Sequence, residues 1–237
     1  MLNMDFTQRL VIDTLALDWV ASPANGVNRK PLEREAAESG HVTSIVEYLP
    51  GTRFSKHTHP LGEEILVLKG VFSDELGDYP AGTYLRNPPG SAHAPFSEHG
   101  CVILVKLNQF DEHDLEYVRI DTNQASWQPV IGEMEILPLH SFKQENVALL
   151  RWNGPDAYHS HGHFGGEELL VLEGTLIDEH GEYPKGTWTR SPHASQHAPY
   201  VTEPTTLWFK TGHLPTKNKA TIHCRLILSK SVSDYGC

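Results

Sequence analysis

Hydrophobic residues in this chain occur in short runs separated by turn-forming residues. In the first half, residues 11–17, 43–49, 64–68 and 102–107 are rich in β-branched and apolar side chains. Segments containing Pro and Gly separate these runs, and no stretch has a helical period with caps at both ends. Regularly spaced short strands are typical of sandwiches and barrels, so the pattern predicts an all-β chain.

Residues 63–68 carry apolar side chains at both sets of alternating positions. In a strand, alternate side chains point to opposite faces, so both faces of this strand are partly apolar. We therefore expect its outer face to be covered by another sheet, either in this chain or in a partner. Homodimerisation follows as a hypothesis.

The second half repeats the first. Residues 57–97 align with residues 161–201 without a gap, at an offset of 104, and 22 of these 41 positions are identical. Such self-similarity indicates a tandem duplication. We predict two small antiparallel barrels, in domains of residues 1–123 and 124–237, with a closing strand at residues 221–228.

Composition narrows the classes of function. The net charge of −11 over 237 residues argues against binding to nucleic acid or to an anionic membrane. Charged residues interrupt the first 20 positions, and no apolar run approaches the roughly 18 residues of a membrane span. We expect a cytoplasmic protein. Its three cysteines include no Cys-x-x-Cys pair and are expected to be structural thiols.

Each repeat carries three histidines and a glutamate at matched spacing. Two histidines separated by one residue project to the same face of a strand, and a bend before the glutamate can turn its carboxylate toward them. This donor set suits Fe, Zn, Ni, Mn or Co and leaves coordination positions open for a water, dioxygen or a substrate. The predicted ligands are His57, His59, Glu63 and His93 in the first half, and His161, His163, Glu167 and His197 in the second.

Two further sets of residues have alternative interpretations. His159 also forms a His-x-His pair with His161, but only His161 and His163 reproduce the spacing to the glutamate; His159 either tunes the site or lies on the surface. Arg86 and Arg190 occupy equivalent positions. Each either binds an anionic ligand at the pocket mouth or pairs with a strand neighbour.

The motifs resemble those of the cupin family. The pattern Gly-x5-His-x-His-x3-Glu-x6-Gly over residues 51–70 resembles the first cupin motif, and Gly-x5-Pro-x-Gly-x2-His over residues 82–93 resembles the second, although Ser97 replaces a common Asn. Residues 63–70, 77–82 and 86–93 are similar to the cupin domain of the ChrR anti-sigma factor. This resemblance implies a bicupin of two jelly rolls, each binding one divalent transition metal (Zn, Fe or Ni) through the eight residues named above.

The resemblance to ChrR does not extend to its helical zinc-binding domain, which holds the sigma factor, so sigma-factor binding is not expected without an additional domain. Three functions remain: a metal-dependent sensor that binds a small molecule, an Fe(II) dioxygenase that cleaves a small diketone or related ketone, and a bicupin decarboxylase or oxidase. The third would need a flexible acidic lid, and no segment clearly supplies one. Our prediction is the sensing or ligand-binding protein, with the dioxygenase as the alternative.

Overall fold

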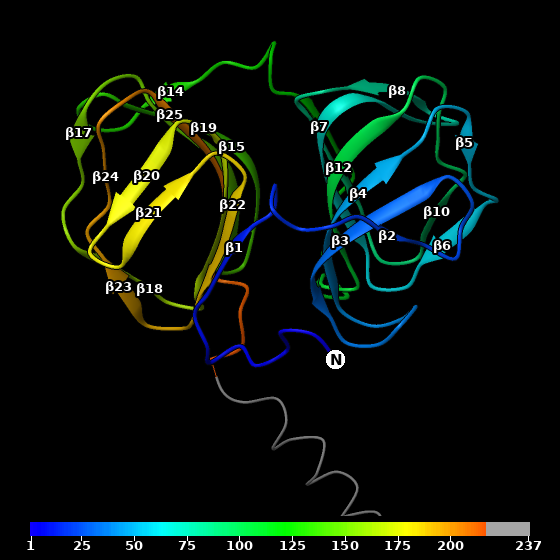
Figure 1. Cartoon of the computed structure of the whole chain (residues 1–237), viewed down its shortest axis with the longest axis horizontal. Helices are drawn as coiled ribbons and strands as arrows, with labels where there is room; N and C mark the ends of the chain where they lie inside the picture. Colours follow the sequence, from blue (N-terminus) through cyan, green and yellow to red (C-terminus); the bar gives the residue numbers. More distant parts are fainter. Residues whose placement is uncertain (217–237) are drawn as a thin grey trace, which may run out of the picture.

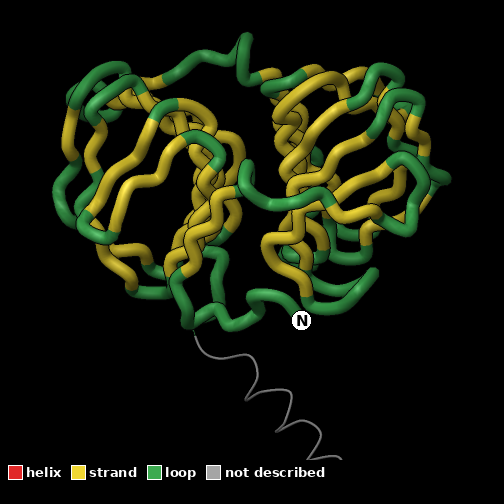
Figure 2. Tube along the Cα trace, viewed as in Figure 1, coloured by secondary structure: helices red, strands yellow, loops and turns green. Residues whose placement is uncertain are grey.

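The computed structural model describes residues 1–216, which form strands and loops without a helix (Figure 2). Two antiparallel barrels lie side by side, one for each repeat (Figure 1). The predicted all-β architecture is therefore confirmed. The predicted closing strand at residues 221–228 lies outside the described residues, as do Cys224 and Cys237.

The N-terminal barrel is built on one large sheet. The order of its main path is β13 (Val118–Asp121), β9 (Thr83–Asn87), β7 (Glu63–Asp74), β12 (Cys101–Leu107), β4 (Val42–Tyr48), β3 (Val27–Arg34) and β2 (Val20–Ala21). Short strands complete the barrel: β5 (Thr52–Arg53), β8 (Gly77–Pro80), β11 (Phe96–Ser97), and the separate pair β6 (His57–His59) and β10 (Ser91–His93).

The C-terminal barrel repeats this plan. Its largest sheet has the order β1 (Leu10–Asp13), β22 (Thr187–Ser191), β19 (Glu167–Glu173), β25 (Thr205–Thr211), β16 (Glu145–Trp152), β15 (Met134–Phe142) and β14 (Gln128–Pro129). A second sheet has the order β17 (Asp156–Ala157), β24 (Tyr200–Val201), β20 (Thr175–Asp178) and β21 (Gly181–Pro184), and a separate pair is formed by β18 (His161–His163) and β23 (Ser195–His197).

The two repeats exchange their first strands. β1 pairs with β22 of the C-terminal barrel, whereas β13, which opens the second repeat, pairs with β9 of the N-terminal barrel. The N-terminal segment, blue in Figure 1, crosses between the barrels to make this pairing. β1 ends at Asp13, earlier than the predicted strand, because the Asp13 carboxylate accepts hydrogen bonds from the next backbone amides and forms a turn. The domain boundary at residue 123 stays a prediction.

The outer faces of the two large sheets pack against each other. This explains the apolar residues on both faces of residues 63–68: the cover is the other barrel of the same chain. The buried residues of this inter-barrel core are Leu32, Ile45, Leu66, Tyr84, Leu104, Val118, Leu137, Leu139, Val147, Leu149, Leu170, Trp188 and Trp208.

Buried ion pairs cross the same interface. Lys210 of the C-terminal barrel lies 2.7 Å from Glu64 of the N-terminal barrel and 2.9 Å from Glu145. Arg86 contacts Glu64 at 3.1 Å, Asp114 at 2.5 Å and Glu145 at 3.1 Å. Burial alone would raise the pKa of Glu145, but the charges of Lys210 and Arg86 outweigh it and lower the pKa to about 2. Glu145 therefore stays ionised at neutral pH.

A second cluster is related to the first by the duplication. Lys106, the equivalent of Lys210, lies 2.5 Å from Glu168 of the other barrel, and Glu168 also contacts His213 at 2.8 Å. Arg190, the equivalent of Arg86, is paired with Glu33. Buried charges are tolerated when they are paired with opposite charges, and the arginines and lysines of both clusters have carboxylate partners across short distances.

Candidate metal centres

Strands β6 and β10 bring the three histidines of the first repeat together. They pair antiparallel with His57 opposite His93, and His59 lies one pleat further along β6 on the same face. The Nε2 atoms of His59 and His93 are 3.0 Å apart. One ring nitrogen from each histidine lies within 4.8 Å of the others, so the three can bind a single ion.

Glu63 adds an oxygen donor to this group. Gly62, with φ of 78°, makes the bend that precedes β7, a backbone conformation that glycine adopts without steric cost. The Oε2 atom of Glu63 lies 3.5 Å from His59 Nε2 and 3.3 Å from His93 Nε2. The Asn87 amide donates a hydrogen bond of 2.8 Å to the same oxygen and helps to orient the carboxylate.

The second repeat has the same arrangement on β18 and β23. His161 lies opposite His197, and the Nε2 atoms of His163 and His197 are 3.1 Å apart. The three ring nitrogens again lie within 4.8 Å of one another. Glu167 Oε2 is 3.6 Å from His163 Nε2 and 3.8 Å from His197 Nε2. Ser191 stands at the position equivalent to Asn87 of the first repeat. Burial raises the pKa of the Glu167 carboxyl to about 7.

Hydrogen bonds orient the histidine rings. The Nδ1 atom of His57 donates to the Ser55 carbonyl and that of His161 to the His159 carbonyl, both at 3.0 Å. A carbonyl oxygen can only accept, so each ring keeps its Nε2 lone pair for a metal. This tautomer is the one that a metal bound through Nε2 requires.

Two aspartates that the sequence analysis missed hold the last histidine of each set. Asp74 Oδ2 lies 3.3 Å from His93 Nδ1, and Asp178 Oδ2 lies 3.2 Å from His197 Nδ1. Burial alone would lower the pKa of His93 and of His197, but these contacts outweigh it and raise both. The sequence contains a pattern that could have identified these aspartates. Each aspartate precedes its histidine by 19 residues, and both residues are identical in the two repeats.

We predict that Asp74→Asn weakens metal binding at the first site only and that Asp178→Asn weakens it at the second site only. Each substitution removes the negative charge that orients the coordinating imidazole and makes it more basic. The expected loss of affinity is about 10–100-fold. Competition with a chromophoric chelator measures it, and each variant is the matched control for the other. Equal weakening of both sites by either variant would contradict the assignment.

Burial keeps other histidines of the sites neutral. It lowers the pKa of His59 and, together with the charges of His197 and His161, lowers the pKa of His163 to about 3. Neutral imidazole is the form that binds a metal. His59 and His163 therefore present unprotonated nitrogen donors at physiological pH.

The structure also decides between the alternative interpretations of His159 and of the two equivalent arginines. The His159 ring is exposed and its centroid lies 6.3 Å from that of His161, so its contribution to the site is the backbone carbonyl described above. Arg86 and Arg190 are fully buried in the two inter-barrel clusters. They pair with carboxylates there, which excludes the interpretation that they bind a ligand at a pocket mouth.

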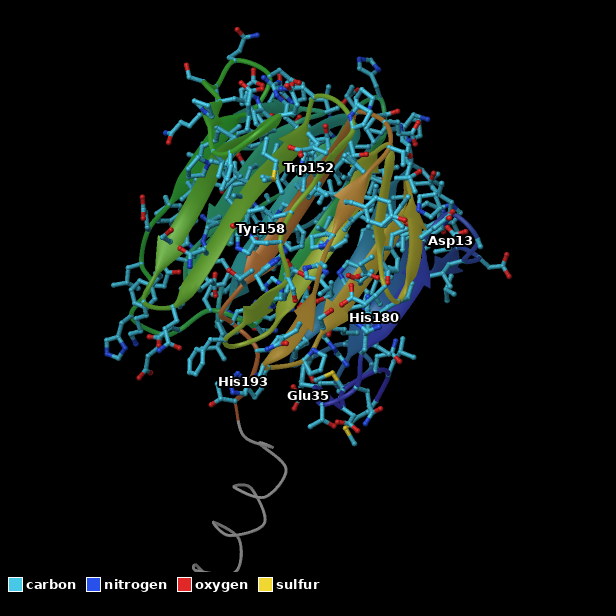
Figure 3. The ribbon with its side chains drawn as sticks, turned by 90° about the vertical axis from the view of Figure 1, so that its left-hand side faces the viewer. Asp13, Glu35, Trp152, Tyr158, His180 and His193 are labelled. Atoms are coloured by element: carbon cyan, nitrogen blue, oxygen red, sulfur yellow. The ribbon has the colours of Figure 1, made fainter. Side chains whose placement is uncertain are left out.

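Two cavities, each of about 290 Å³, border the C-terminal triad. The first lies in the barrel interior against His161, His163, Glu167 and His197. Its other walls are mostly apolar and include Trp152, labelled with Tyr158 on this barrel in Figure 3. The second cavity reaches His163 and His197 and is also lined by Arg9, His180, Ser191, Pro192, Ser195 and Gln196.

The sequence matches one family model over most of its length. The model of the ChrR cupin-like domain matches twice, at residues 7–111 and 116–215. The chain belongs to the ChrR cupin-like family. This membership and the two barrels confirm the prediction of two tandem cupin domains, each a jelly roll. A sequence search of curated proteins gave no significant match.

Solved structures with the same fold cover both barrels. A candidate dioxygenase from Nostoc punctiforme superimposes with a TM-score of 0.73 at 16% identity, covering 89% of this chain and 85% of that protein. A mutant form of Bacillus subtilis oxalate decarboxylase gives 0.60 at 13% identity, with coverages of 94% and 85%. The bacterial pirin YhhW of Escherichia coli, bound to nickel(II), gives 0.62 at 11% identity, with coverages of 88% and 99%. At these identities the likeness establishes the fold.

The donor atoms of both centres fit a divalent transition metal. Three imidazole nitrogens with one carboxylate oxygen make a borderline set that Zn²⁺, Fe²⁺ and Ni²⁺ accept. The buried aspartates behind His93 and His197 supply the outer contacts that metal-binding histidines usually have.

None of the residues that the structure describes forms a helix long and apolar enough to cross a membrane.

Proposed function

We propose that this bicupin is a metal-dependent sensing or small-ligand-binding protein with a three-histidine, one-glutamate metal site in each half. The ligands would be His57, His59, Glu63 and His93 in one barrel, and His161, His163, Glu167 and His197 in the other. The observation that carries the proposal is that the second donor set forms one wall of an apolar cavity. A ligand held there would be in reach of the metal.

The residues around the cavity have separate tasks in this proposal. His161, His163, His197 and Glu167 would hold a Zn, Fe or Ni ion, which when bound supplies a Lewis acid for an oxygen atom of the ligand. The apolar side chains of Leu169, Leu207 and their neighbours exclude water from the ligand. Asp178 fixes the His197 ring, so the donor set is organised before a ligand arrives.

A second candidate function is an Fe(II)-dependent dioxygenase that cleaves a small diketone or related ketone. Two observations favour it: the fold is shared with the candidate dioxygenase from Nostoc, and the cavity of about 290 Å³ lies at the small end of the usual range of ligand pockets. In this alternative the same side chains orient the substrate beside the metal and exclude water.

Metal analysis of protein purified anaerobically without an affinity tag tests both functions. Two equivalents of zinc per chain, with no oxygen uptake after addition of 2,4-pentanedione, would support the sensing or ligand-binding function. Iron together with oxygen uptake would favour the dioxygenase. Protein that contains no metal and takes up no zinc, iron or nickel would refute both functions.

The remaining expectations are part of the same proposal. We propose a cytoplasmic protein whose partner is a small molecule, which does not engage nucleic acid, a membrane or a sigma factor, and which can form a homodimer. Light scattering at working concentration tests the dimer, and a monomeric mass would refute it.

A further inference from the structure

The two barrels carry equivalent donor sets but differ in their interiors. At the position next to the last histidine, the N-terminal barrel has Phe72 and the C-terminal barrel has Leu176. The register confirms the equivalence, because Phe72 pairs with Tyr79 and Leu176 with Tyr183, both 104 residues apart. One repeat therefore serves as an internal control for the other.

Phe72 lies in the buried core of the N-terminal barrel. It is 1% exposed, and its ring centroid lies 6.1 Å from that of His93, 5.8 Å from that of Tyr48 and 6.3 Å from that of Tyr79. The ring thus occupies the space beside the triad. Leu176 has no ring, and it lines the apolar cavity that borders the C-terminal triad.

A second difference concerns charge. Arg29 and Ile136 are equivalent, since they pair with Val46 and Leu150 respectively, which are 104 residues apart. Arg29 forms an ion pair of 3.0 Å with Glu38. Ile136 instead lines the apolar cavity. The duplication has therefore left an arginine in one barrel where the other has a hydrophobic wall.

The C-terminal cavity also contains an unused hydrogen-bond donor. Trp152, in the place of Tyr48, is 2% exposed and lines the cavity, and its indole Nε1 has no partner among the described residues. A buried donor without a partner is costly, and an acceptor atom on a ligand would satisfy it. The rest of the lining, including Leu150, Leu207 and Phe209, is apolar.

We infer that the two barrels have different tasks: the C-terminal barrel binds the ligand, and the N-terminal barrel holds its metal as a structural element. The ligand is a small, mainly apolar molecule that carries an oxygen-donor group such as a carboxylate or an enolate. Its apolar body fills the cavity bounded by Leu176, Ile136 and Trp152, and its oxygen faces the triad. This inference rests on the proposed function, because it requires metal in the C-terminal site.

The test uses 4-fluorobenzoate, which combines an apolar ring with a carboxylate and is too weak a chelator to compete for the metal. Zinc-loaded full-length protein is titrated and followed by fluorine NMR and by calorimetry. We expect one equivalent to bind per chain. His57→Ala should keep this binding and His161→Ala should abolish it, with zinc content checked in each protein.

A pair of matched variants tests the cavity itself. Leu176→Phe copies the first barrel into the second and should weaken binding about tenfold or more while zinc stays at two equivalents. Phe72→Leu, the reverse change, should leave affinity at the C-terminal site unchanged. Thermal unfolding verifies that both variants fold.

Several results would overturn the inference. These are two equivalents of fluorobenzoate bound to the wild-type protein, no binding at all to protein with two zincs, or binding that survives His161→Ala. None of these three results depends on how Leu176→Phe packs. A protein that takes up no zinc would instead refute the proposed function, so the two failures are distinguishable.

Discussion

His57→Ala and His161→Ala are each expected to lower the metal content from two equivalents per chain to one. Each variant removes one of three nitrogen donors whose atoms lie within 4.8 Å of one another. The loss of one imidazole opens a coordination position and weakens the hold on the ion, so we expect exhaustive dialysis to remove it. Because the two centres are in different barrels, each variant should spare the other centre, and the double variant should bind no metal.

Elemental analysis after exhaustive dialysis measures this loss, and circular dichroism verifies that each variant is folded. His159→Ala is the matched control, since it removes a neighbouring imidazole whose ring is exposed and which is not part of the triad. It should retain two equivalents. Unchanged metal content in His57→Ala or in His161→Ala would refute the ligand set of that barrel.

Lys210→Met is expected to lower the free energy of unfolding by about 3–5 kcal/mol, the usual cost of removing one partner from a buried ion pair. Lys210 is fully buried and contacts Glu64 and Glu145, which approach it from different barrels. Methionine preserves the apolar stem but leaves the two carboxylates with Arg86 as their remaining buried cation. The lost free energy should mainly weaken the association of the two barrels, because the broken contacts join them.

Urea unfolding at neutral pH measures the effect. Lys106→Met, in the related cluster, should be similarly destabilising because Lys106 is 1% exposed and pairs with Glu168. Lys185→Met is the control: its pair with Glu173 is exposed, and its loss should cost less than about 1 kcal/mol. A loss of about 1 kcal/mol or less in Lys210→Met would show that the buried cluster contributes little to stability.

Adding Glu64→Gln to Lys210→Met should recover part of the lost stability. The second change removes one of the uncompensated negative charges, and buried pairs are often replaced at little net cost when both partners change together. The double variant therefore separates the cost of an unpaired charge from the net contribution of the pair.

The sequence by itself determined the duplication, the all-β class and the predicted donor sets. The reason is local: a His-x-His pair on a strand must share a face, and a glycine before the glutamate permits the bend that turns the carboxylate back. The match of one repeat to the other made the convergence of His93 and His197 with these pairs expected. Apolar residues on both strand faces were also enough to predict a covering sheet.

Tertiary structure alone decided how the two halves meet. The exchange of β1 and β13 depends on which sheet edge each strand reaches, and a local sequence pattern does not encode that choice. Arg86 and Arg190 illustrate the same limit, because their burial follows from carboxylates that are distant along the chain. The cavity beside His161 likewise results from how Leu176, Trp152 and Ile136 pack together. Packing volume and long-range charge pairing are properties of the assembled chain, so they appear only in the folded structure.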